Sequence, residues 1–330
     1  MPYIPERKPV VPDPQAVQEQ KRAEKRRKIL RLSFGILAAA MAVYGAVRLI
    51  TYQTEAASSR ETSRELQQAW EEAGQAAEAT AEATREEVKE TPVPQLPSPA
   101  PETAAPQTTA AAQADSGRLV PAAYPDNPEL KMSDRFRELR KKSQYIVGWL
   151  SMEGLEEAVV RKDNTYYLDH DAMGKKNSNG AIFLDESIYL TTRPYTLILY
   201  GHNMKNGNMF GRLKKYRESS YYYKHRVIRF DSMYEEGQYA VFAVLEFNTV
   251  PGTVGWYNIW NLASDDRETR NEAIRKLEER SACGSLIDVQ AEDQILLLVT
   301  CLDGDTERMM VAARRLRDGE NEQHLTLKME

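Results

Sequence analysis

An apolar segment near the N-terminus constrains this chain more than any other feature, because it predicts a membrane-spanning helix. No charge occurs from Leu32 to Val47. Counting from Ile29 to Ile50 gives about the 20 residues that a helix needs to cross a bilayer, with the terminal arginines snorkelling. A basic cluster precedes the segment, comprising Lys21, Arg22, Lys25, Arg26, Arg27, Lys28 and Arg31.

Basic residues hold their side of a span in the cytoplasm. We therefore expect a single-pass cell-membrane protein, with a cytoplasmic N-terminus and everything after Thr51 outside the cell. A cleaved signal peptide is the alternative, because "TEAASSR" follows Gln53 and contains small residues.

Two segments of biased composition follow the apolar run. Residues Glu55 to Glu90 are rich in Ala and Glu, which favour helix, and Thr91 to about Asn127 is rich in Pro, Ala and Thr, which is typical of an extended, mostly disordered spacer. The predicted organisation is a cytoplasmic basic tail at 1–28, a transmembrane signal anchor at 29–50, an extracellular stalk at 51–129 and a folded head at 130–330.

The head contains many short strand-like runs bounded by Gly, Asn, Asp or Pro. They are Ala158–Val160, Ile182–Leu184, Thr196–Tyr200, Val227–Phe230, Gln238–Phe247, Gln294–Thr300 and Arg308–Leu316. Two helices are expected as well. Asp134 is placed to cap the first, with Phe136 and Leu139 on one side, and Asp265 to cap the second. This pattern predicts a mainly β fold with peripheral helices (α+β), either a barrel or a sandwich.

Composition narrows the function classes. The net charge of −5 gives no bias towards nucleic acid as a partner. The few histidines are scattered, and no ligand cluster at metal spacing or phosphate-cradling glycine loop occurs. We predict no obligatory cofactor, and the sequence leaves calcium binding open.

Two apolar runs end on residues that can carry chemistry. The run in "ILYGHNMKNGNMF" ends at His202, and "ILLLVTC" ends at Cys301. A short polar turn from Leu302 to Glu307 leads to Arg308. If the two runs form a hairpin, the side chains of Cys301 and Arg308 lie close together where the strands meet the turn. A thiol nucleophile needs a base or a positive charge; a histidine can transfer the proton, and an arginine can stabilise an oxyanion.

Each residue also has a plainer interpretation. His202 taken alone is a turn histidine bonded to the backbone, and Cys301 is a small buried hydrophobe. Arg308 taken alone is a charge at a strand edge, with Arg314, Arg315 and Arg317 as competitors. A disulfide between Cys283 and Cys301 would make thiol chemistry impossible, and we expect Cys301 to be free instead.

Longer motifs point to one family. They are "VGWL" (Val147 to Leu150), "DNTYYLDHDAMGKKNSNGAIFLD" (Asp163 to Asp185), "LYGHNMKNGNMFGRLKKY" (Leu199 to Tyr216), "VTC" (Val299 to Cys301) and "ERMMVAARRL" (Glu307 to Leu316). In order and spacing the head resembles the class B sortases, the membrane-anchored cysteine transpeptidases of Gram-positive bacteria. The resemblance covers roughly Tyr145 to Leu316, and its histidine block is the most specific part.

The resemblance implies a sortase-like β-barrel in which His202 is the catalytic histidine, Cys301 the nucleophile and Arg308 the arginine of the active site. It implies cleavage of exported proteins at a C-terminal sorting signal similar to Asn-Pro-x-Thr-x, through a thioacyl intermediate. A cell-wall precursor peptide amine, or a pilin lysine, would then accept the new carboxyl group. The substrate-binding residues stay unassigned.

The sequence departs from the family pattern at Val299, where the family often has a serine. The region from Asn248 to Ala282 corresponds to the groove-shaping loop and helix of class B enzymes, and it matches no motif that predicts a signal. Of the other histidines, we expect a structural role for His170, regard His225 as a weak catalytic rival, and place His324 near a polar tail. Two alternative functions remain: a membrane-anchored cysteine peptidase that only hydrolyses, and a catalytically silent binding module.

Overall fold

The computed structural model describes residues 14–90, 117–121, 123–285, 287–302, 305–322 and 325. Its contacts divide the chain into two units, Met1–Glu55 and Ala56–Glu330. Helix α1 (Pro14–Glu90) contains the apolar segment, whose side chains are exposed. By length and composition alone this helix could cross a membrane, a test that a signal sequence also passes.

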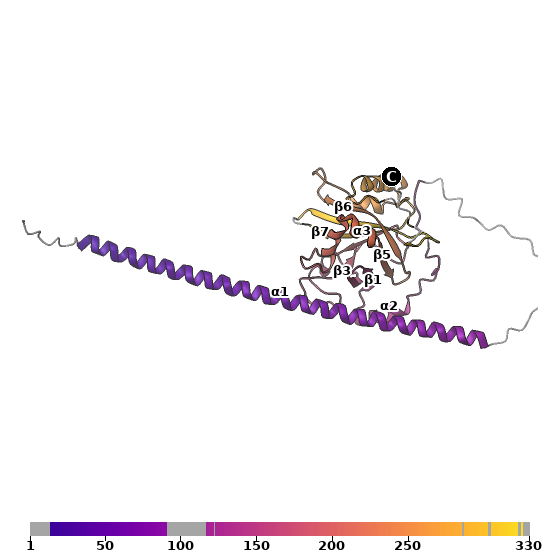
Figure 1. Cartoon of the computed structure of the whole chain (residues 1–330), viewed down its shortest axis with the longest axis horizontal. Helices are drawn as coiled ribbons and strands as arrows, with labels where there is room; N and C mark the ends of the chain where they lie inside the picture. The colour runs from indigo at the N-terminus through magenta and orange to yellow at the C-terminus, as the bar shows by residue number, and fades with distance from the viewer. Residues whose placement is uncertain are drawn as a thin grey trace, which may run out of the picture. The chain divides into compact units, whose positions relative to one another are not determined.

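The second unit contains a closed barrel of eight strands (Figure 1). The strands are β1 (Ile146–Met152), β2 (Leu155–Val160), β3 (Ile182–Leu184), β4 (Thr196–Tyr200), β5 (Val227–Ser232), β6 (Gln238–Asn248), β7 (Ile295–Cys301) and β8 (Glu307–Arg315). Around the barrel they follow the order β1-β2-β3-β4-β7-β8-β6-β5, and β5 closes the ring by pairing with β1. The predicted mainly β fold with peripheral helices is confirmed, and of the two predicted architectures it is the barrel.

Strands β4 and β7 are parallel neighbours, and their apolar side chains are buried in the main core. Because strands buried on both faces read as continuous apolar runs, these two were recognisable from sequence. Strand β1 was missed, although six of its seven residues are buried. Its sequence "IVGWLSM" follows a predicted helix without a turn signal. Gly148 fits there because a Cβ would lie 2.5 Å from the ring of Phe230.

Short helices surround the barrel. They are α2 (Asp134–Lys142), α3 (Ser219–Lys224) and α4 (Arg267–Glu279), with 3-10 turns η2 (Tyr166–Leu168), η3 (Phe210–Arg217) and η4 (Ile259–Ala263). Both predicted helices exist, and Phe136 and Leu139 are buried as expected.

Both predicted helix caps were wrong by one residue. Ser133, not Asp134, caps α2, since its side chain accepts from the amide of Phe136. Asp266, not Asp265, caps α4, since its carboxylate accepts from the amide of Thr269 at 2.8 Å. Asp265 instead pairs with Arg118. Adjacent residues with equal capping propensity cannot be separated until the backbone is placed.

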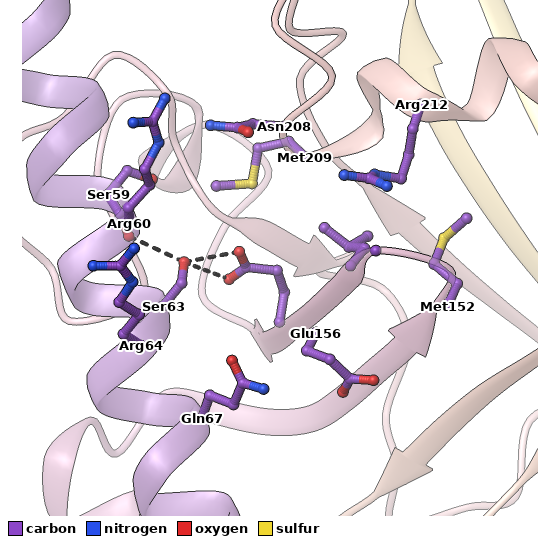
Figure 2. Close-up of a pocket in the computed structure, with 13 residues that line it drawn as sticks. Ser59, Arg60, Ser63, Arg64, Gln67, Met152, Glu156, Asn208, Met209 and Arg212 are labelled. Atoms are coloured by element: carbon purple, nitrogen blue, oxygen red, sulfur yellow. Dashed lines mark hydrogen bonds between the residues drawn. The ribbon is translucent and has the colours of Figure 1, made fainter.

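Part of the predicted stalk packs on the barrel. In the segment of α1 after Ala56, Leu66 is 1% exposed, and the Trp70 ring stacks on Trp149 with centroids 5.0 Å apart. The Trp70 ring also meets Phe136 of α2 edge-on at 5.2 Å. Figure 2 shows Ser63 pointing from α1 towards the barrel, where its Oγ lies 2.8 Å from the carboxylate of Glu157 on β2.

The C-terminal end of the predicted stalk also makes contacts. Leu119 and Tyr124 are buried, and the amide of Leu119 donates to the carbonyl of Asp265. The domain boundary predicted at residue 130 therefore lies inside a packed region. Residues 91–116 of the spacer predicted from Thr91 to about Asn127 lie outside the described residues.

Candidate active site

Cys301 and Arg308 face each other across one hairpin. Strands β7 and β8 are antiparallel, and their register pairs Cys301 directly with Arg308. Directly opposed residues of an antiparallel pair have Cβ atoms about 5 Å apart. The side chains of Cys301 and Arg308 therefore project from neighbouring backbone positions, as the sequence predicts for a hairpin.

His202 follows the strand beside that hairpin. In the parallel pair of β4 and β7, Tyr200 is aligned with Val299. The ladder continues one step further, because the amide of Gly201 donates to the carbonyl of Val299 at 3.2 Å. The Thr300 hydroxyl then donates to the carbonyl of Gly201 at 2.7 Å. His202 and Cys301 each come one residue after this bond, so the fold brings His202, Cys301 and Arg308 to one barrel rim.

Both cysteines are free thiols, and their environments differ. Cys301 is exposed, whereas Cys283 is buried. Burial raises the pKa of the Cys283 thiol, so it ionises less readily than an ordinary cysteine. The expectation that Cys301 is free is confirmed, and the environment of Cys283 disfavours it as a rival nucleophile.

A backbone carbonyl fixes the imidazole of His202. Its Nε2 lies 2.6 Å from the carbonyl oxygen of Leu168 in η2. A carbonyl can only accept a hydrogen bond, so Nε2 must carry the hydrogen. Within the described part of the chain, Nδ1 has no hydrogen-bond partner. Nδ1 is therefore the nitrogen that is free to take a proton from a thiol or give one to a leaving amine.

Gly180 lies close to the same ring. It has a φ of +62°, and a Cβ there would lie 2.4 Å from the carbonyl oxygen of Tyr167 and 3.0 Å from Cδ2 of His202. Only glycine can adopt this positive φ without strain and also leave room for the Tyr167 carbonyl and the His202 ring. In the sequence, Gly180 stands out only as part of a longer motif, and the carbonyl of Leu168 has no sequence signature.

A cavity of about 340 Å³ opens beside Arg308. Its walls come from the end of β4, from β7 and from the segment after β6, and among its lining residues Arg308 is the only charged one. The aromatic members are Tyr200, Phe247, Trp256, Tyr257 and Trp260. The phenol of Tyr200 keeps its proton, because burial first, and the charge of Asp185 second, raise its pKa. The cavity therefore combines an aromatic wall with a single positive charge at Arg308.

The other histidines lie in other settings. His170 stacks on Tyr166 with centroids 4.1 Å apart, and its Nδ1 lies 2.9 Å from that residue's carbonyl. His225 follows α3, where it packs against Tyr221. The contacts of His170 fit a structural role. His324 lies outside the described residues, and no group of three or more metal-ligating side chains occurs within those the structure describes.

Comparison with known proteins identifies the family. A family model described as the sortase domain matches residues 154–316. Sortase B of Listeria monocytogenes is 30% identical over 197 residues, which cover 57% of this chain and 74% of that protein. The chain belongs to the class B sortases. It is therefore a sortase enzyme, a cysteine transpeptidase.

Solved class B sortase structures agree with this fold. The crystal structure of Staphylococcus aureus sortase B matches with a TM-score of 0.51 and 28% identity, over 57% of this chain and 90% of that one. A Staphylococcus aureus sortase B-substrate complex matches with a TM-score of 0.50 and 27% identity, over 58% and 88% of the two chains. These matches cover most of each solved sortase B chain, so they extend over the barrel of this chain.

Proposed function

We propose that this class B sortase cleaves exported proteins at a C-terminal sorting signal similar to Asn-Pro-x-Thr-x and attaches them to the cell wall. The observation that carries the proposal is the meeting of an exposed thiol, an imidazole with a free Nδ1 and a guanidinium at one rim. A Staphylococcus aureus sortase B-substrate complex is among the similar structures, which supports binding of a substrate by this fold.

In the first half-reaction, the Cys301 thiolate attacks the carbonyl carbon of the signal's threonine and an S–C bond forms. Arg308 stabilises the resulting oxyanion. The C–N bond then breaks, and Nδ1 of the His202 imidazolium gives its proton to the leaving amine. The product is a thioester on Cys301, with a neutral His202 still held at Nε2 by Leu168.

In the second half-reaction, an acceptor amine attacks the thioester carbonyl. Its proton passes to Nδ1 of His202, and the Cys301 thiolate leaves, so both groups return to their starting forms. The proposed acceptor is a cell-wall precursor peptide amine, or a pilin lysine. The cavity lined by Trp256, Trp260 and Arg308 is proposed to hold the signal's side chains, with Arg308 as its one charged wall residue.

We further propose that 29–50 is a signal anchor with the catalytic domain outside the cell. The basic cluster before the span supports this orientation. A membrane-impermeant maleimide applied to intact cells should label Cys301 and spare a Cys301→Ala variant. Labelling that appears only after the cells are lysed would contradict the orientation.

The central test is product analysis by mass spectrometry. The full chain in vesicles is incubated with a peptide containing Asn-Pro-x-Thr-x, with and without an added amine. We expect a ligated product with the amine, a trapped adduct on Cys301, and neither with Cys301→Ala. Cys283→Ala is the matched control and should remain active.

Other products would identify the alternatives. Hydrolysed peptide alone, even in excess amine, would contradict transpeptidation with this pair and favour the peptidase. Peptide binding without an adduct would favour the silent binding module.

A further inference from the structure

The segment whose Leu168 carbonyl contacts the imidazole of His202 also receives a hydrogen bond from helix α1, outside the barrel strands. The carbonyl of Leu168 belongs to a segment that runs to Gly180, and the amide of Ala181 closes that segment by donating to Tyr167 at 3.0 Å. At its centre lies Asp171, which is 2% exposed. A buried carboxylate in this position needs hydrogen-bond donors for both of its oxygens.

The two oxygens of Asp171 are satisfied differently. Oδ1 accepts from the amides of Met173 and Lys175, at 3.0 and 2.9 Å, within the segment itself. Oδ2 accepts from the hydroxyl of Thr62 at 3.0 Å. Among the described residues, Thr62 is the only side chain from outside the segment that donates to Asp171.

Thr62 is held by the packing of α1. It is 6% exposed, and it lies four residues before Leu66 and eight before Trp70, on the helix face that packs on the barrel. The stacking of Trp70 on Trp149 fixes that face. The hydroxyl of Thr62 is therefore presented to Asp171 by a rigid element and not by a loop.

We propose that Thr62 and Asp171 are positioning residues for His202, so that α1 takes part in catalysis by fixing the Leu168 carbonyl that orients the imidazole. The inference rests on the role proposed for His202. Loss of the Thr62 hydroxyl leaves a buried carboxylate oxygen without a donor. The Asp171 segment then shifts, Leu168 releases Nε2, and the hydrogen is no longer confined to that nitrogen.

The test compares two adjacent residues of α1 that donate to different parts of the barrel. Thr62→Val removes the bond to Asp171 at nearly constant shape, and Thr62→Ser restores a hydroxyl. Ser63→Ala is the matched control, because Ser63 donates to Glu157 on β2. Each variant of the full chain is prepared in vesicles, and its unfolding midpoint is measured first.

Two readouts follow. The ¹⁵N chemical shifts of the His202 imidazole report its tautomer without any turnover, so this readout stands even if the proposed reaction does not. For Thr62→Val we expect shifts that move towards a mixture of tautomers, a three- to tenfold lower kcat of roughly one hydrogen bond's size, and an unchanged KM. The pH profile of kcat should change as well. Thr62→Ser and Ser63→Ala should keep the wild-type shifts and profile.

Three results would overturn the inference. Unchanged imidazole shifts in Thr62→Val would show that Asp171 does not act on His202. Equal changes in Thr62→Val and Ser63→Ala would assign the effect to helix packing as a whole. Altered shifts with an unaltered kcat and pH profile would remove the link to catalysis, while the sulfur adduct on Cys301 would still test the proposed function separately.

Discussion

At the barrel rim, Cys301 is exposed and the imidazole of His202 keeps one nitrogen without a partner among the described residues. On the face covered by α1, Leu66 is buried and Trp70 stacks on Trp149. The first region therefore leaves polar groups accessible to solvent, and the second buries apolar side chains through packing. We expect substitutions at the rim to change rates with little effect on folding, and substitutions under α1 to change stability first.

The largest expected effect is at the rim. Arg308→Ala should lower kcat by about 10²- to 10³-fold, the usual loss when an oxyanion donor is removed, with an unchanged unfolding midpoint. Single-turnover kinetics measure this loss. Arg275→Ala on α4 is the matched control, because Arg275 is exposed and pairs only with Glu272 and Glu279 in the described chain. Similar losses in both variants would contradict the role of Arg308.

The next effect compares two tryptophans, one from each region. Trp70→Ala should reduce the free energy of unfolding by about 3 kcal/mol, because it removes a ring packed between Trp149 and Phe136. Trp260→Ala, at a side chain that is 46% exposed and lines the rim cavity, should instead raise KM and cost less than about 1 kcal/mol of stability. Denaturant unfolding measures the stability of both variants, and steady-state kinetics measure their KM. A raised KM in Trp70→Ala with a large stability loss in Trp260→Ala would contradict the distinction between the two regions.

Substitutions at two glycines near His202 should distinguish the effect of a steric clash with the imidazole from the effect of backbone strain. Gly180→Ala introduces a Cβ against the Tyr167 carbonyl and the imidazole, and we expect about a tenfold lower kcat with about 2 kcal/mol lower stability. Gly207→Ala has a similar positive φ but no atom within 4 Å of its Cβ. It should lose stability alone, so a loss of kcat in both would assign the effect to loop strain.

The smallest effect is a pH dependence of stability on the helix-covered face. Burial raises the pKa of Glu157 from 4.5 to about 7, partly offset by the bond from Ser63. The folded state therefore keeps a proton that the unfolded state loses, so the contribution of Glu157 to stability is most favourable below pH 4.5 and becomes less favourable as pH rises towards 7. Glu157→Gln should reduce the change in the free energy of unfolding across this pH range by about 1–2 kcal/mol.

The remaining slope has a second source. Burial also raises the pKa of Asp231 from 3.8 to about 6, so it lowers stability in the same direction as pH rises. Denaturation curves between pH 4 and 8 measure both contributions. An identical slope in wild type and Glu157→Gln would show that the Glu157 carboxyl is not enclosed by α1.

The sequence by itself determined the barrel strands that are continuous apolar runs, and the resemblance of its motifs to the sortase family nominated His202, Cys301 and Arg308 as candidates. Burial on both faces leaves an uninterrupted apolar pattern in β4 and β7, and a thiol, an imidazole and a guanidinium can be recognised as chemical groups wherever they lie. A run without turn signals, such as β1, and the choice between neighbouring caps gave no comparable local signal.

Only the tertiary structure decided how those groups are oriented. The tautomer of His202 depends on the carbonyl of Leu168, which every residue type possesses, so no pattern of letters can mark it. The packing of α1 joins Thr62 to Asp171 across 109 positions. Such contacts are set by which surfaces meet in three dimensions, because each partner alone is an ordinary polar or apolar side chain.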